Sequence, residues 1–224
     1  MRHGKAYDLA DHKALALQGA AVRVRLERDP SVYRVPVEAA EIHGVADFLS
    51  AAECARFRDM VDAVAQPSST FDQARHSTYR TSYSGDVVRD DPLVQMIERR
   101  IDDLLGIDQS FGETIQGQRY TAGQEFRAHH DWFVTTAPYW PDQQRRGGQR
   151  SWTAMIYLND VEAGGATEFP QLDMSVPPQQ GTLLCWNNAK ADGSPNDRTL
   201  HAALPVELGV KYVITKWYRA RTWG

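Results

Sequence analysis

The second half of the sequence constrains the fold most, because from about Phe111 onward short apolar and β-branched runs alternate with glycine, proline and aspartate. Short runs bounded by such turn residues are typical of strands. The expected strands occupy residues 113–121, 125–133, 150–159, 166–169, 174–178, 181–188, 198–206 and 210–220. About eight short strands at this spacing predict a double-stranded β-helix, the jelly-roll or cupin-like double sheet.

Two helices are expected before this β-rich half. Ser50 followed by Glu53 is a capping box, so a helix begins there. A second helix is expected between Asp91 as N-cap, with Pro92 in its first turn, and Gly106 as its terminator. The fold class predicted is therefore α+β, with N-terminal helices supporting a double-stranded β-helix core.

The N-terminal region carries a weaker pattern. Leu9, Leu15 and Leu17 have loosely helical spacing, and residues 21–27 alternate valine and leucine with arginine, which predicts a half-buried strand. We expect residues 1–110 to pack on a catalytic core of residues 111–224, in one compact unit. Residues 1–40 fit either a lobe on the sheet or a homodimer contact.

Composition narrows the classes of partner. The chain has 25 basic and 29 acidic residues among 224, so no basic field invites nucleic acid. No apolar run is long enough for a bilayer, and the N-terminus lacks the apolar stretch of a signal peptide. We therefore expect a cytoplasmic protein without membrane partners, in which Cys54 and Cys185 are buried thiols.

The run "RAHHDWF" holds the candidate metal ligands. On a strand, residues i and i+2 face the same side, so His129 and Asp131 converge while His130 points away. His201, at the start of a later strand, is the candidate third ligand. Two histidines and one carboxylate form the facial triad of non-haem Fe(II) oxygenases. A hydrolytic zinc site could use the same set, but no H-E-x-x-H pattern accompanies it.

Lys211 lies ten positions after His201, on the following expected strand. A buried cation beside a metal with open positions would suit a ligand that chelates at one end and is anionic at the other. On spacing alone, Lys211 could equally be a surface lysine on an edge strand.

Several motifs together resemble one family. They are "VADFLSAAEC", "RTSYSGDV", "RYTAGQEFRAHHDWF", "YLNDVEAGGATEFP", "VPPQQGTLLCWNN", "DRTLHAALPV" and "GVKYVITKWYR". In order and spacing, from about Val45 to Arg221, they resemble the prolyl 4-hydroxylase α-subunit-like branch of the Fe(II)/2-oxoglutarate dioxygenases. Phe126 and Ala128 depart mildly from this pattern, where the family often has tyrosine and proline.

The resemblance implies roles for individual residues. His129, Asp131 and His201 would bind iron, and Lys211 would bind the distal carboxylate of 2-oxoglutarate. Tyr120 and Thr153 match positions that line the same co-substrate pocket. A second group is expected near the substrate: Arg80, Tyr139, Trp140, Trp186 and Trp217. Core packing explains Trp186 and Trp217 equally well. Tyr139 and Trp140 belong to residues 134–149, an expected loop where family members fold a flap over substrate.

The resemblance also implies an activity. The cofactors would be Fe(II), 2-oxoglutarate, O2 and ascorbate, and the reaction would be hydroxylation of a prolyl residue with decarboxylation of 2-oxoglutarate to succinate and CO2. The substrate would be a proline-containing peptide or protein. Two alternatives stay open: the same chemistry on a free amino acid or another peptidyl residue, and a non-catalytic metal-binding jelly-roll module.

Overall fold

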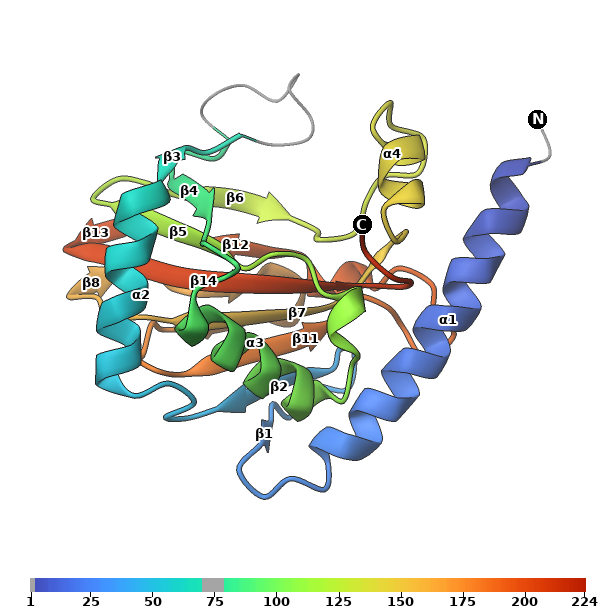
Figure 1. Cartoon of the computed structure of the whole chain (residues 1–224), viewed down its shortest axis with the longest axis horizontal. Helices are drawn as coiled ribbons and strands as arrows, with labels where there is room; N and C mark the ends of the chain where they lie inside the picture. The colour runs from blue at the N-terminus through green and yellow to red at the C-terminus, as the bar shows by residue number, and fades with distance from the viewer. Residues whose placement is uncertain (1–2, 70–78) are drawn as a thin grey trace.

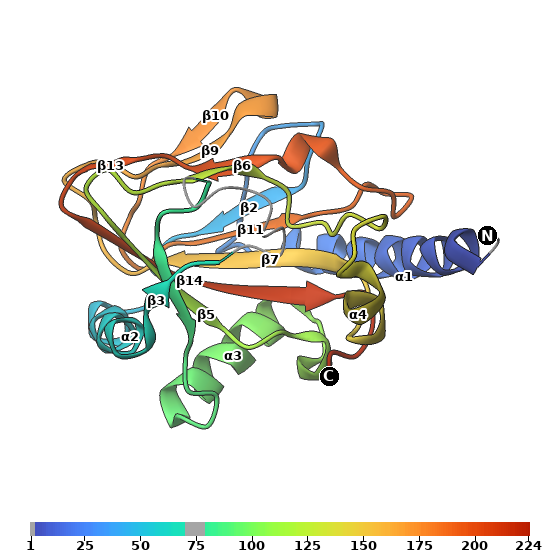
Figure 2. The same cartoon turned by 90° about the horizontal axis from the view of Figure 1, so that it is seen from above.

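The computed structural model describes residues 3–69 and 79–224 and contains two β-sheets that face each other, with helices on the outer face of the larger one (Figures 1 and 2). The larger sheet has the strand order β1-β2-β11-β7-β14-β5-β4-β3 and the smaller has β10-β9-β12-β6. The pairings within both sheets are antiparallel. Strand β14, the longest, therefore lies inside the larger sheet.

The strands of the larger sheet are β1 (Tyr33–Arg34), β2 (Ile42–Val45), β3 (Gln66–Pro67), β4 (Tyr83–Asp86), β5 (Gln116–Thr121), β7 (Arg150–Tyr157), β11 (Leu183–Asn187) and β14 (Val210–Arg219). Those of the smaller sheet are β6 (Phe126–His129), β9 (Thr167–Phe169), β10 (Met174–Val176) and β12 (His201–Ala203). A two-stranded ribbon pairs β8 (Ala163–Gly164) with β13 (Val206–Leu208). Each segment predicted as a strand from residue 113 onward contains one.

Helices α2 (Ala51–Val64) and α3 (Pro92–Leu105) form where the sequence predicts them. Both halves of the capping box at Ser50 are present. The side chain of Asp91 accepts hydrogen bonds from the first turn of α3, and Gly106 ends that helix in the left-handed conformation at φ 67°. Both helices pack on the larger sheet and share one apolar core with it.

The expected strand over residues 21–27 is wrong. Helix α1 runs from His3 to Leu26, and it buries Leu15, Val22 and Leu26 along one side. Leu17, expected on the buried face, is 65% exposed, and Val24 is exposed too. Residues spaced by four and seven share a helix face, so the valine and arginine alternation here satisfies a helix as well as a strand.

The expected loop over residues 134–149 contains a short helix, α4 (Trp140–Arg145). Its backbone is held from β14, because Arg219 donates hydrogen bonds to the Gln143 side chain at 2.8 Å and to the Gly148 carbonyl at 2.7 Å. Among the described residues, no helix is long and apolar enough to cross a bilayer.

Helix α2 sits against two facing glycines. Gly85 on β4 pairs with Gly117 on β5, and a Cβ at either position would overlap α2, at the Val64 carbonyl oxygen and the Val61 side chain respectively. The absence of both side chains lets the helix approach the sheet closely.

We therefore expect Gly85→Ala to lower the free energy of unfolding by about 1–3 kcal/mol, because the added methyl group meets helix backbone that cannot move aside. Urea denaturation measures this. Gly44→Ala on β2 is the matched control, since its Cβ would have ordinary contacts at 3.9 Å from the Leu183 carbonyl oxygen. Equal stability of the two variants would contradict the close approach.

Candidate active site

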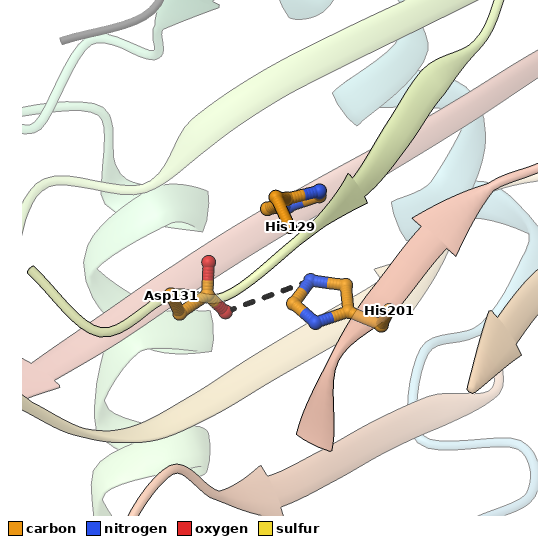
Figure 3. Close-up of side chains that lie close together, drawn as sticks. All are labelled: His129, Asp131 and His201. Atoms are coloured by element: carbon orange, nitrogen blue, oxygen red, sulfur yellow. Dashed lines mark ion pairs between the residues drawn. The ribbon is translucent and has the colours of Figure 1, made fainter. Parts of the chain in front are cut away.

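The pairing of β6 with β12 brings two of the predicted ligands together. His129 lies directly opposite His201 in the antiparallel register, and their ring centroids are 4.2 Å apart. Strand β6 ends at His129, so Asp131 lies in the bend beyond it and not on the strand as expected. Its Oδ2 is 3.8 Å from His201 Nε2 (Figure 3). One ligand atom from each of the three residues lies within 4.8 Å of the others.

Hydrogen bonds to backbone orient both rings. His129 Nδ1 lies 2.8 Å from the Arg127 carbonyl oxygen, and His201 Nδ1 lies 3.0 Å from that of Thr199. A carbonyl oxygen only accepts, so both Nδ1 atoms carry a proton, and Nε2 is the ring atom of each histidine that is available to a metal. Burial, followed by the neighbouring charge of His201, holds the pKa of His129 well below 6.5. His129 is therefore a neutral ligand at physiological pH.

Asp131 is held as an ionised carboxylate. Burial alone would raise its pKa, but the nearby His201, His129 and Arg150 side chains and the hydrogen bond from Thr153 together outweigh burial and keep the pKa below its ordinary value. Thr153 Oγ1 donates to Asp131 Oδ2 at 2.6 Å, and Asn188 Nδ2 donates to Thr153 Oγ1 at 2.9 Å. This chain fixes one oxygen of Asp131 from behind.

A small cavity of about 50 Å³ connects the triad with Lys211, Tyr120 and Thr153. Lys211 is 1% exposed, and its Nζ lies 5.5 Å from the ring centroids of both Tyr120 and Tyr157. Burial lowers its pKa to about 7. Within the described residues no hydrogen-bond acceptor pairs with this ammonium group, so Lys211 is an uncompensated cation and not a surface lysine.

Three more predicted residues lie around the small cavity: Tyr120, expected beside the co-substrate, and Trp186 and Trp217, expected near the substrate. Tyr120 donates its hydroxyl proton to Gln118 Oε1 at 2.7 Å. Trp186 packs against His201, with ring centroids 4.8 Å apart, and it also lines the small cavity. Trp217 lines this cavity and the larger one beside it.

A larger cavity of about 650 Å³ opens on the other side of the triad. Arg80 and Tyr139 line it, as expected for residues near a substrate. Arg80 stacks on Phe126, with its guanidinium carbon 4.7 Å from the ring centroid, and donates to Gln116 Oε1 at 3.1 Å. Trp140 departs from expectation, because it is buried at 8% exposure and is not among the residues that line either cavity.

Sequence analysis missed a buried ionic cluster beside the site. Glu113 accepts two hydrogen bonds from Arg150, at 2.7 and 2.9 Å, and one from Arg219 at 2.6 Å. Arg150 also lies over the Trp217 ring, 4.0 Å from its centroid, and 3.9 Å from Asp131 Oδ1. No local pattern marks these residues, since they meet only when β7 and β14 pair.

Comparison with known proteins finds a similarity to one superfamily. Residues 115–219 match the model of the 2OG-Fe(II) oxygenase superfamily, where 2OG is 2-oxoglutarate. This stretch contains all three triad residues and Lys211. This part of the chain is therefore similar to the 2OG-Fe(II) oxygenase superfamily.

Among its relatives are prolyl 4-hydroxylase α subunits. The chain is 40% identical to rat subunit alpha-1 over 134 residues, which are 59% of this chain and 24% of the relative. It is 36% identical to rat subunit alpha-3 over 178 residues, 76% of this chain and 32% of the relative. The chain thus spans between a quarter and a third of the length of these two relatives.

Solved structures share the fold. One is the viral collagen prolyl hydroxylase of Paramecium bursaria Chlorella virus-1 in its 2OG complex, with a TM-score of 0.62, 24% identity, and coverage of 79% of this chain and 94% of the viral one. Another is a Trichoplax adhaerens prolyl hydroxylase in complex with a hypoxia inducible factor peptide, with a TM-score of 0.61, 16% identity, and coverage of 93% and 91%.

The residues of the site fit the two groups in the name of that superfamily, Fe(II) and 2-oxoglutarate. Two imidazoles and one carboxylate suit Fe(II), and each is oriented by a hydrogen bond. The buried Lys211 offers a positive charge in the same cavity, as an anionic co-substrate requires.

Removing the support behind Asp131 tests this fit. We expect Thr153→Val to weaken metal affinity about 10- to 100-fold, because Asp131 loses the hydrogen bond that orients it. Anaerobic calorimetric titration with Fe(II) measures the affinity. Thr167→Val is the matched control, since Thr167 is also buried but hydrogen-bonds to Tyr157 at 2.7 Å. If both variants lose affinity equally, the effect belongs to general destabilisation and not to Asp131.

Proposed function

We propose that this protein is a Fe(II)/2-oxoglutarate-dependent dioxygenase that hydroxylates a prolyl residue of a peptide or protein. The observation that carries the proposal is Lys211, a fully buried cation with no acceptor among the described residues, in one cavity with His129, Asp131 and His201. Burying an unpaired ammonium group costs stability, and an anionic ligand would remove that cost. A non-catalytic metal-binding module gives no reason to keep such a lysine beside the triad.

Each residue then has a role in the reaction. His129 Nε2, His201 Nε2 and an Asp131 oxygen would hold the metal, and Lys211 would orient the distal carboxylate of 2-oxoglutarate. Bound Fe(II) supplies the redox chemistry that couples decarboxylation of 2-oxoglutarate, to succinate and CO2, to the insertion of one oxygen atom of O2 into a substrate C–H bond. Trp186 and Phe169 pack around His201 and exclude water from this side of the ligands.

The prolyl substrate is supported by the relatives and by the larger cavity. The matched α subunits are prolyl 4-hydroxylases by name. The cavity of about 650 Å³ is in the range of sites for ligands larger than one amino acid, which favours a peptide over a free amino acid. Its wall includes the aromatic side chains of Trp132, Tyr139 and Trp217, which suit an apolar ring.

Two further statements belong to the proposal. The two facing antiparallel sheets support assignment as a double-stranded β-helix. From the family resemblance we also propose ascorbate as the reductant that rescues oxidised iron. Cytoplasmic residence stays a prediction from the sequence. A homodimer through residues 1–40 stays a prediction.

An anaerobic titration with Fe(II) and then 2-oxoglutarate tests the central claim. We expect a weak visible charge-transfer band that saturates with 2-oxoglutarate, because a 2-keto acid chelates the iron. In Lys211→Ala the concentration needed for half-saturation should rise at least about tenfold, since the ion pair with the distal carboxylate is lost. His129→Ala, Asp131→Ala and His201→Ala should give no band and no turnover while keeping the fold.

Lys216→Ala is the matched control, because Lys216 is a buried lysine on the same strand but faces away from the cavities. It donates to Asp102 Oδ1 at 2.8 Å under helix α3. This variant should lose stability and keep the band. Absence of the band in the folded native protein would point to another metal or to a non-catalytic domain.

Binding of 2-oxoglutarate should depend on pH through Lys211. With its pKa near 7 in the ligand-free protein, Lys211 loses its proton as pH rises above 7, and the dianion binds the protonated form. At saturating metal, the dissociation constant should therefore increase by up to about tenfold per pH unit above 7. Lys211→Arg stays charged across this range, so its profile should be flat. A flat profile in the native protein would refute the role of this pKa.

A further inference from the structure

Helix α1 lies outside residues 115–219, which match the superfamily. Its turn around Asp11 and His12 nevertheless lies beside the larger cavity. The helix has one buried face, which starts at Asp11 and continues through Leu15, Gly19 and Val22 to Leu26. Val22 and Leu26 belong to the main core under the larger sheet. Asp11 and Leu15 contact different parts of the protein, at the end where α4 and the C-terminus lie (Figure 1).

The first of these contacts is made by Asp11. Its carboxylate is 1% exposed and pairs with the guanidinium of Arg221. Arg221 in turn donates to the Gln144 carbonyl oxygen in α4 at 2.6 Å. Asp11 also lies against Gly148, where a Cβ would be 2.6 Å from Asp11 Oδ2. Asp11 thus fixes the segment that leads directly into Arg150, which lines the larger cavity.

The second contact is made by backbone. The His12 carbonyl lies so close to Gly193 that a Cβ there would overlap it, and Gly193 has a φ of 80° that favours glycine. Nearby, Leu15 packs with Ala189 and Ala220. The loop through Gly193 continues into residues 195–197. These residues line the larger cavity, as do Arg150 and Trp132.

The third contact joins α1 to the residue beside the metal site. The ring of His12 lies 6.3 Å from that of Trp132, centroid to centroid, within the range of aromatic pairs. Trp132 directly follows Asp131 and lines the larger cavity. One short piece of helix therefore contacts Trp132 of the cavity wall, and also Gly148 and Gly193, each two positions before a lining residue.

We propose that residues 11–19 of α1 are a positioning element for the substrate cavity. They hold Trp132, the segment before Arg150 and the loop before residue 195 in one arrangement, and they touch none of the candidate metal ligands. The consequence for substrate rests on the proposed function: this helix sets the affinity for the peptide and leaves the metal and 2-oxoglutarate sites unchanged.

Two variants test the element. Asp11→Asn removes the charge that pairs with Arg221 at nearly constant shape, and His12→Ala removes the ring beside Trp132 from a partly exposed position. In each we expect KM for a proline-containing peptide to rise roughly tenfold, because a wall displaced by a fraction of an ångström no longer matches the peptide. The kcat and the 2-oxoglutarate titration should stay within about twofold of the native values.

Val22→Ala is the matched control. It weakens the same helix face two turns further on, in the main core, and should lower stability while leaving KM unchanged. Hydrogen exchange followed by mass spectrometry gives a readout that needs no activity. In Asp11→Asn and His12→Ala, protection should fall in residues 130–134, 144–149 and 189–197, and should be kept in β6 and β12.

The outcomes separate this proposal from the proposed function. Loss of protection spread evenly over the chain, or the same KM change in Val22→Ala, would reduce α1 to a general stabilising role. Localised loss of protection with native KM would refute the link to substrate. If the native protein hydroxylates no prolyl peptide, the proposed function fails, and the exchange pattern still decides whether α1 positions the cavity wall.

Discussion

The site depends on one pairing, that of β6 with β12 in the smaller sheet. Antiparallel register places His129 opposite His201, so two imidazoles from distant parts of the chain face the same space. A shift of one residue would turn one of the histidines to the other face, since side chains alternate along a strand. The bend after β6 then returns Asp131 toward both rings. The other residues of the site orient these three side chains, enclose them or place a charge beside them.

Strand β14 shows how the protein separates chemistry from support. Its two buried lysines point to opposite faces of the larger sheet. Lys216 faces the helices, where Asp102 and Glu98 neutralise it at 2.8 and 3.7 Å. Lys211 faces the small cavity, where no described acceptor does so. Two lysines of similar burial on one strand therefore differ in a single respect, the presence of a counter-charge, and that difference points to a ligand at Lys211.

The sequence predicted those elements that are determined by residues close together in the chain. The strands after residue 113 follow from β-branched runs between turn residues, and α2 and α3 follow from their caps. At α1 the local pattern was ambiguous, because alternating valine and arginine residues fit both a helix and a strand. Packing decides between the two. Trp140 was placed near substrate because it lies in an expected loop, but the helix that forms there buries it.

The buried ion pairs could not be predicted from the sequence, for a different reason. Glu98 and Asp102 read as exposed positions on α3 until Lys216, more than a hundred residues later, supplies their partner. The same holds for Glu113, which needs Arg150 and Arg219 together. Each charge is tolerated inside only because strand pairing delivers its counter-charge, and no window of sequence contains both.

The two cavities are enclosed by different kinds of segment. The small cavity is lined mostly by strands of the two sheets, whose positions are fixed by backbone pairing. The wall of the larger cavity includes segments outside the strands, namely residues 132–134, residues 195–197 and Tyr139. Residues outside the strands are held by other contacts, among them the ion pair of Asp11 with Arg221 and the hydrogen bond from Arg221 to the Gln144 carbonyl oxygen. Chemistry set by paired strands would then stay constant, while changes in the supporting helix could alter which substrate fits.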